Sequence, residues 1–415
     1  MTDLNRNLLT AGLVCAASAS LVGGIYLREK VDADRAGLRA ATSLAPGLMA
    51  SRENRVDIPE ERYFYDLMLL LKREYVEPIK DETSLATGAV KGMISSLDDE
   101  RSLYMSKPVF QAFVNGLQGK FEGIGAKLSL RRLKEPGKEP LRTSLDFLER
   151  IPVVRVTYVV PGGPADKAGL VAGDEIERID GHWVVNPTDV ARIRRVLQQV
   201  EAKRLPAKAQ LDVQAELRDK LKTSIMPMRA YERLMVGEAG LVNLTWRRSG
   251  KTQDAALEKK NSIITINKQN GNEFRLAFVP SAAERLKDAI TQDKKLVVDL
   301  RGTDQGDFKS MLECLAVVAP SGVIGKVVNE KGTAEQVRVS KGAVKAQAIT
   351  IRVDRFTGGL GEAFAIALKS RGLAKIEGGA MAGDPSILER TALADGSGFT
   401  LRVGKFQPVK AGGKA

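Results

Sequence analysis

The longest apolar run of the chain lies close to its N-terminus. Residues 8–27 contain no charged side chain, and about 20 such residues are enough for a helix to cross a bilayer. A cleaved signal peptide is the alternative, since Ala17, Ser18 and Ala19 form a small-residue cleavage site. Because the apolar run continues past Ala19, we favour a single-pass anchor in the cell membrane. In both cases we expect the bulk of the chain outside the cytoplasm, in the periplasm or the cell exterior.

C-terminal to this run, the sequence is first polar and then has the spacing of helices. Residues 28–62 are polar and rich in alanine, which is typical of a stalk. After the stalk, apolar residues recur three or four positions apart, first around Phe64 and Leu67 and then around Leu85 and Ala89. This spacing predicts two helices with one apolar face each, and we expect both faces to pack in a core.

The middle of the chain has the pattern of strands. Residues 153–160 are rich in β-branched side chains and predict a strand, and residues 161–176 follow with a short helix bracketed by glycines. A charged helical stretch at 201–236 precedes a further strand at 241–247. In the remainder, residues 249–415, strands and helices alternate, which is typical of an α/β core.

The composition narrows the possible function classes. With 415 residues, 43% of them hydrophobic and 28% charged, the chain is long enough for several folded domains. The formal net charge is +13, but the basic excess is spread along the chain, and aromatic residues make up only 5%. This pattern argues against nucleic acid as a partner and favours a solvated surface near an anionic membrane.

Histidine and cysteine are rare. The sequence contains one histidine, His182, and two cysteines, Cys15 and Cys314. A zinc site of His and Cys needs about four such ligands, and a Ser-His-Asp triad would depend on His182 alone. We therefore expect no metal site and no cofactor.

The segment at 161–176 resembles the hallmark segment of PDZ domains, Pro-Ala-x-x-Ala-Gly-Leu-x-x-Gly-Asp-x-Ile. The resemblance implies that an extended protein C-terminus adds as a strand, with backbone N–H groups of a glycine-rich loop holding its carboxylate. The helix after Pro187 should line the groove with one of its apolar side chains, for which we take Val190. Four residues match the loop and its strand: Gly123, Ile124, Gly125 and Ala126.

From about residue 63 to residue 406, the order and spacing of several motifs resemble the carboxyl-terminal processing, or tail-specific, serine peptidases of family S41. Among them are Tyr75-Val-Glu-Pro, Asp299-Leu-Arg-Gly and Asp354-Arg-Phe. The resemblance implies a mixed α+β and α/β architecture of N-terminal helices, a PDZ domain with a helical insertion, and a peptidase α/β core. The expected parts are an anchor or signal segment at 1–27, a stalk at 28–62, a helical region at 63–120, the PDZ domain at 121–248 with its insertion at 201–236, and the core at 249–415.

The catalytic positions of that family do not match this sequence. The family nucleophile is a serine in a stretch that here reads Asp354-Arg-Phe-Thr-Gly-Gly-Leu-Gly-Glu, which places Gly359 at its position. A glycine has no side chain with which to attack a peptide bond. The position of the lysine base holds Asp384, and the supporting acidic position holds Ser370. The oxyanion-side loop, Thr303-Asp-Gln-Gly, keeps only Gly306 as a flexible backbone donor.

These features predict a membrane-anchored pseudo-peptidase that binds protein C-termini or peptides without cutting them. An active peptidase paralogue is a further candidate partner. Two alternatives remain open. One is a working serine endopeptidase with displaced catalytic groups, for which Thr357 and Ser386 are candidates. The other is an envelope scaffold in which even the PDZ groove is closed.

Overall fold

The computed structural model describes residues 60–79, 81–97, 99–118, 120–121, 123–130, 151–236, 240–260, 262–263, 269–292, 295–329, 331–340 and 349–409. The expected anchor and nearly all of the expected stalk lie outside the described residues. Among the helices of the described part, none combines the length and apolar character needed to cross a membrane. The chain divides into two compact units, Met1–Leu85 and Ala86–Ala415.

The two predicted N-terminal helices are present as α3 (Glu60–Glu74) and α4 (Glu82–Ser96). Among the described residues, neither apolar face is packed in the core of its own unit, and the prediction of core packing stays a prediction. Leu67 on α3 is 53% exposed, and α4 has no buried residue. Helical spacing of apolar residues defines a face, but it does not supply a partner for that face.

The second unit contains a PDZ-type sheet with the strand order β3-β4-β5-β7-β8, in which β6 also pairs with β5. Its core side packs apolar residues such as Ile124, Val156 and Trp246 into one cluster. The elements are β3 (Ala126–Ser129), β4 (Arg155–Val159), α7 (Pro164–Lys167), β5 (Glu175–Ile179), β6 (His182–Trp183), β7 (Gly240–Arg248) and β8 (Lys251–Lys259).

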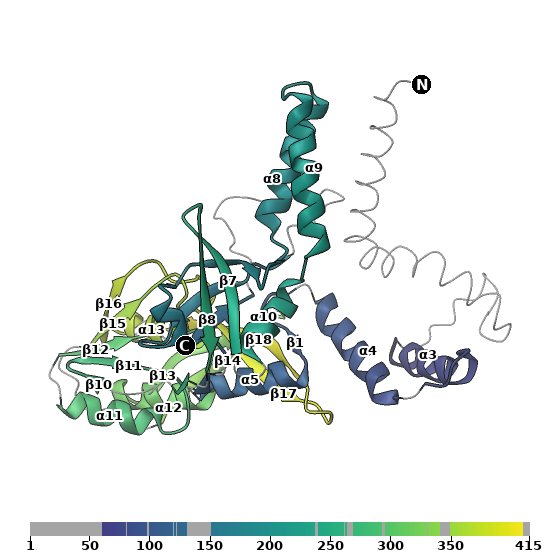
Figure 1. Ribbon diagram of the computed structural model, residues 1–415. Helices are drawn as coiled ribbons and strands as arrows, with labels where there is room; N and C mark the ends of the chain where they lie inside the picture. Colours follow the sequence, from purple (N-terminus) through teal and green to yellow (C-terminus); the bar gives the residue numbers. More distant parts are fainter. Residues whose placement is uncertain are drawn as a thin grey trace, which may run out of the picture. The chain divides into compact units, whose positions relative to one another are not determined.

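Between β6 and β7 lie three helices: the first is the helix predicted after Pro187, and the other two fall in the single charged helical stretch predicted at 201–236. They are α8 (Pro187–Glu201), α9 (Ala207–Lys222) and α10 (Pro227–Met235). Helices α8 and α9 run side by side as a hairpin (Figure 1). The buried Asp189 at the start of α8 holds the hairpin by accepting from Lys220 at 2.9 Å and from Trp183 at 3.2 Å. Burial alone would raise the pKa of Asp189, but Lys220 outweighs it and the net pKa is lowered.

The C-terminal core is built around the sheet β10-β11-β12-β15-β16, whose strands are parallel except at the β10–β11 pair. Strands β11, β12 and β15 end at one edge, where loops lead into helices, and this is the usual place for a site in an α/β sheet. The elements are β10 (Gln269–Asn270), β11 (Glu273–Arg275), α11 (Ala282–Gln292), β12 (Leu296–Asp299), α12 (Phe308–Val318), β15 (Ile349–Val353), α13 (Gly359–Ser370) and β16 (Ala374–Gly378).

A second core sheet has the strand order β1-β18-β13-β14, with β17 paired to β18. Its first strand comes from the N-terminal region of the unit, since Tyr104 pairs with Phe399. This pairing brings the segment around Arg101 to the core, next to the edge described above. The remaining elements are β1 (Tyr104–Met105), α5 (Lys107–Leu117), β2 (Lys120–Phe121), β9 (Ser262–Ile263), β13 (Gly322–Val328), β14 (Ala334–Val339), β17 (Ser386–Ala392) and β18 (Gly398–Pro408).

Candidate functional site

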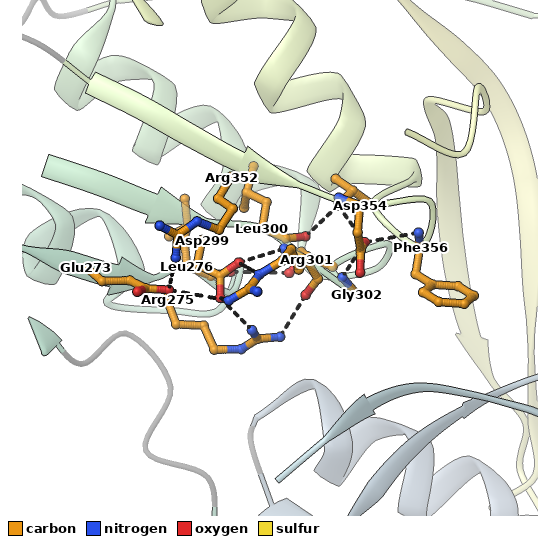
Figure 2. Close-up of polar contacts among 12 residues, drawn as sticks. Glu273, Arg275, Leu276, Asp299, Leu300, Arg301, Gly302, Arg352, Asp354 and Phe356 are labelled. Carbon is orange, nitrogen blue, oxygen red and sulfur yellow. Dashed lines mark hydrogen bonds and ion pairs between the residues drawn. The ribbon is translucent and has the colours of Figure 1, made fainter. Parts of the chain in front are cut away.

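The Asp-Leu-Arg-Gly and Asp-Arg-Phe motifs meet at the ends of β12 and β15, where they fix the loops of the site (Figure 2). Asp299 is buried and accepts from Arg275 at 3.1 Å and from Arg301 at 2.9 Å. Asp354 accepts from the amide N–H groups of Gly302 and Phe356, each at 3.0 Å. Charged hydrogen bonds of this kind define the paths of both loops. The two motifs therefore act as supports of the site.

Gly359, at the nucleophile position, is the first residue of α13. Its φ of +47° lies in the left-handed region, and its N–H donates to the carbonyl of Asp384 at 2.8 Å. A Cβ atom added here would lie 1.9 Å from the carbonyl oxygen of Asp304. The backbone of the neighbouring loop thus occupies the space that a catalytic side chain would need.

The loop from Thr303 to Gly306 packs directly on the start of α13. The N–H of Gly358 donates to the Thr303 carbonyl at 3.1 Å, and a Cβ added to Gly361 would lie 2.3 Å from the same oxygen. Gly306 packs against Phe278, since a Cβ there would lie 2.7 Å from the Phe278 Cβ. Glycines at these points allow a close fit between loop and helix.

The lysine position holds a carboxylate that is paired with an arginine. The Asp384 side chain accepts from Arg101 Nε at 2.7 Å and from the Ser386 hydroxyl at 2.5 Å. Arg101 is only 4% exposed and also reaches Asp304 at 3.3 Å. Burial by itself would raise the pKa of Asp384, but the charge of Arg101 and the Ser386 hydrogen bond outweigh it, so the net pKa is lowered. A carboxylate held in this way is a poor general base.

Two further acids surround this pair. Burial raises the pKa of Asp304, although the charges of Arg101 and Lys127 oppose the shift. Burial also raises the pKa of Glu362, which accepts from the Asp384 N–H at 2.8 Å. The centre of the site is therefore an arginine surrounded by carboxyl groups. Among the described residues, no group of three or more His, Cys, Asp or Glu side chains could hold a metal ion.

The groups considered as displaced catalysts have other contacts. Thr357 is fully buried, and its hydroxyl donates to the Leu300 carbonyl at 2.9 Å. Ser386 is 1% exposed and donates to Asp384. Ser370 donates to the Ala367 carbonyl of its own helix at 2.9 Å. Thr357 and Ser386 each also donate to a carboxylate, Asp354 at 3.1 Å and Asp384 at 2.5 Å, and the lowered pKa of Asp384 makes it a poor base for the Ser386 hydroxyl.

The glycine loop of the PDZ domain lies at the start of β3, as its sequence position predicts. Its carbonyls are fixed, since Gly123, Ile124 and Gly125 each accept at 2.9 Å, from Lys260, Ala165 and Val160 respectively. The structure pairs none of the three amide N–H groups of this loop with another described residue. Ala126 follows as the first residue of β3 and is buried. The loop therefore has the donors that a carboxylate would need.

The helix beside this loop is α10, whereas Val190 lies on α8. A Cβ added to Gly123 would lie 2.0 Å from the Leu234 carbonyl of α10. Val190 packs instead with Trp183 and Val185 in a separate small cluster. The sequence predicts α10 as part of the insertion, because helical spacing does not show which helix packs against a given strand.

A cavity of about 110 Å³ is lined by residues of β3 and α10. Its walls also include α5, the loop at Asp304 and Arg101. Burial, followed by the charge of Arg275, lowers the pKa of Lys127 to about 8. Burial raises the pKa of Tyr231 to about 12. Sequence reasoning missed Arg101, Lys127 and Tyr231, because no local pattern marks residues that only the fold brings together.

Three family models match the chain. Residues 155–207 match the PDZ domain, residues 264–412 match peptidase family S41, and residues 23–109 match the N-terminal domain of the activating protease CtpB. A PDZ domain joined to an α/β peptidase core defines the class of protein. The chain carries the PDZ and S41 peptidase domains and is similar to carboxy-terminal processing proteases, which confirms the predicted resemblance to this family and the predicted mixed fold.

The relatives and solved structures agree with this assignment. The carboxy-terminal processing protease CtpB of Bacillus subtilis (strain 168) is 26% identical over 81% of this chain and 65% of its own length. A probable CtpA-like serine protease of Staphylococcus aureus (strain COL) is 24% identical over 83% of this chain and 60% of its own. The chain thus spans less than two thirds of the length of these relatives.

A solved structure of a photosystem II D1 C-terminal processing protease aligns with a TM-score of 0.55 and 18% identity. The alignment covers 85% of this chain and 89% of that structure. At this level of identity the likeness supports the fold.

Proposed function

We propose that this S41-family protein is a non-catalytic member that binds the C-termini of other proteins through its PDZ domain. The observation that carries the proposal is the geometry at Gly359, where the carbonyl of Asp304 fills the space of a nucleophilic side chain. The ion pair between Asp384 and Arg101 supports it, since the position of the base holds a carboxylate of lowered pKa. An active peptidase paralogue is a candidate source of partner C-termini.

We expect the purified full-length protein neither to hydrolyse peptides nor to be labelled by serine-directed phosphonates. Both reactions need an activated hydroxyl, and Thr357 and Ser386 are buried and donate to other groups. The measurement is fluorogenic peptide turnover with mass spectrometry of the treated protein. Turnover that disappears in Thr357→Ala or Ser386→Ala would establish the displaced-site endopeptidase instead. Turnover that survives both changes would point to a contaminant.

We expect peptides with a free C-terminal carboxylate to bind about ten times more tightly than the same peptides with an amidated end. The reason is that hydrogen bonds to a charged carboxylate contribute about 1.5–3 kcal/mol, and the loop at Gly123–Gly125 has N–H donors for them. Fluorescence polarisation with paired peptides measures the difference. Equal binding of both forms would contradict carboxylate capture, and no binding of either form would favour the envelope scaffold.

We further propose that residues 8–27 anchor the protein in the cell membrane, with the remainder outside the cytoplasm. The twenty uncharged residues and the polar stretch behind them support this placement. In cells, the full-length chain should sediment with membranes and resist extraction by carbonate. Recovery of a shortened mature chain in the soluble exported fraction would refute the anchor and would favour a cleaved signal peptide.

A further inference from the structure

Lys127 on β3 lines two neighbouring cavities. An arginine lines each of them as well, Arg101 the cavity of about 110 Å³ and Arg275 the cavity of about 20 Å³. The guanidinium of Arg275 is held in place by Tyr158, since its Cζ atom lies 3.7 Å from the centre of that ring. The Lys127 side chain is partly exposed. Lys127 is therefore an amine that a small solute can reach, placed near a second positive charge.

These surroundings favour the neutral amine of Lys127. Burial is the largest cause and the charge of Arg275 adds to it, whereas the charge of Asp304 opposes both, and the net pKa is lowered to about 8. About one Lys127 side chain in ten is then neutral at pH 7, against about one in several thousand for an ordinary lysine. Lysines that are desolvated or next to another cation are nucleophiles that form imines with carbonyl compounds. The other titratable groups that line the two cavities are Glu100, Arg101, Tyr158 and Tyr231.

The larger cavity has room for a small molecule next to this amine. Its lining is mixed: apolar residues such as Phe113 and Met228 come from α5 and α10, and the charged residues include Arg101 and Asp304. Arg101 and Asp304 pair with each other at 3.3 Å, so they do not require a charged ligand. A cavity of about 150 Å³ holds benzene, so one of about 110 Å³ suits a molecule of about four or five carbon atoms.

We propose that Lys127 is a covalent binding site for small aliphatic aldehydes, which it captures as imines while the alkyl chain lies in the larger cavity. In this step the amine nitrogen forms a bond to the carbonyl carbon, and the carbonyl oxygen leaves as water with the two hydrogens of the amine. The step needs no oxidant or reductant, and it is reversible. The inference goes beyond the proposed function, since it involves no protein C-terminus and does not depend on peptide binding.

The test treats the full-length protein with 3-methylbutanal and sodium cyanoborohydride, which reduces each imine to a stable secondary amine. Peptide mapping by mass spectrometry then gives the rate of modification at each lysine. Lys309 on α12, whose side chain is 85% exposed, is the internal reference. At pH 7 we expect Lys127 to react about ten times faster than Lys309. This factor is smaller than the gain in neutral amine, because a less basic nucleophile is also a slower one.

The ratio of the two rates should fall as the pH rises from 7 to 9. Lys127 is mostly neutral above about pH 8, whereas an ordinary exposed lysine gains neutral amine throughout this range. The reductant acts on both sites, so its own pH dependence cancels in the ratio. Tyr158 and Tyr231 both have raised pKa values and stay neutral in this range, so the change reports on Lys127.

Two protein variants test whether the cavity holds the alkyl chain. Ala112 is buried on α5 and lines the cavity, so Ala112→Leu should fill it and slow the capture of 3-methylbutanal at Lys127 about tenfold. The same variant should still react with formaldehyde, which has no alkyl chain to place. Gln111→Leu adds the same side chain at the exposed neighbouring position and should change neither rate. The pH dependence of the rate ratio in the unmodified protein tests the amine even if Ala112→Leu does not fold.

Three results would overturn the proposal. Equal rates at Lys127 and Lys309 at pH 7, or a ratio that does not change with pH, would mean that the amine of Lys127 is not activated. Fast capture of 3-methylbutanal that Ala112→Leu leaves unchanged would mean that the cavity does not hold the ligand. Faster capture of glyoxylate, a small carbonyl compound with a carboxylate, would mean that the charged groups of the lining select an anion, and the aliphatic class would be wrong.

Discussion

Replacing Arg101 with methionine is expected to lower the free energy of unfolding by about 3 kcal/mol at neutral pH. The guanidinium is buried and pairs with Asp384 at 2.7 Å and with Asp304 at 3.3 Å. Methionine keeps an unbranched apolar side chain but leaves two acids without their cation. Removing one partner of a buried pair costs about 3–5 kcal/mol, and the lower end applies because both carboxylates are about a quarter exposed. Urea denaturation followed by circular dichroism measures the change.

The matched control is Arg390→Met on β17. Arg390 lies 3.9 Å from Asp307 and is about one third exposed. A pair of this kind contributes about 0–1 kcal/mol, so the control should unfold almost like the unmodified protein. Similar losses in both variants would contradict a special role for Arg101.

The stability difference between Arg101→Met and the unmodified protein should shrink as the pH falls from 7 to 4. Burial opposes ionisation of Asp384, but Arg101 and the Ser386 hydrogen bond together outweigh burial, so the folded pKa lies below the ordinary 3.8. The carboxylate therefore stabilises the unmodified protein throughout the range from pH 7 to 4, since this contribution is lost only at lower pH, as the pH falls through the folded pKa. Without Arg101, burial should dominate and raise the pKa of Asp384. Protonation of this carboxyl group at lower pH should therefore reduce the loss of stability in the variant. A difference that does not change with pH would contradict this assignment.

The parts of the site that could be predicted from the sequence lie in short local motifs. Asp299 and Asp354 stand in short stretches whose hydrogen bonds are made within a few residues or between neighbouring strands. Gly359 follows in the same stretch as Asp354, and Asp384 lies in a later segment whose position was predicted by spacing. For Asp299 and Asp354, the local chain path carries most of the information, because their hydrogen bonds are made close by in the sequence or in the sheet.

Long-range packing explains what the sequence could not predict. Arg101 and Asp384 are 283 residues apart, and long-range contacts such as the pairing of β1 with β18 bring their segments together. Similarly, α8 and α10 are both amphipathic, so their patterns do not distinguish them. The close contact of Gly123 with Leu234 shows that α10 is the helix beside β3. A single sequence contains no signal for such partners, because periodicity describes one element at a time.

Restoring a serine at the nucleophile position should destabilise the protein and yield no peptidase. Gly359→Ser places a side chain where φ is +47° and where the Cβ would lie 1.9 Å from the carbonyl oxygen of Asp304. A left-handed conformation costs an ordinary residue about 1–2 kcal/mol, and overpacking adds about 1–3 kcal/mol. We therefore expect a loss of about 2–5 kcal/mol in the free energy of unfolding, measured by urea denaturation.

The matched control is Gly372→Ser, just after α13. Its φ is +69°, and a Cβ there would meet no heavy atom within 4 Å. This variant carries the backbone strain without the clash, so it should lose only about 1–2 kcal/mol. The difference between the two variants measures how tightly the Asp304 loop packs against the start of α13. Equal losses would mean that the loop moves aside at little cost.

Adding Asp384→Lys to Gly359→Ser should not restore turnover. The new ammonium would lie next to the positively charged Arg101. The ion pair between Arg101 and Asp384 that now stabilises the site would be lost. The serine would still meet the Asp304 carbonyl, so nucleophile and base would lack the geometry that catalysis needs to within about 1 Å. Fluorogenic peptide assays on the double variant test this. Hydrolysis above that of the unmodified chain would mean that the loop can open and that the fold retains a working site once the two groups are supplied.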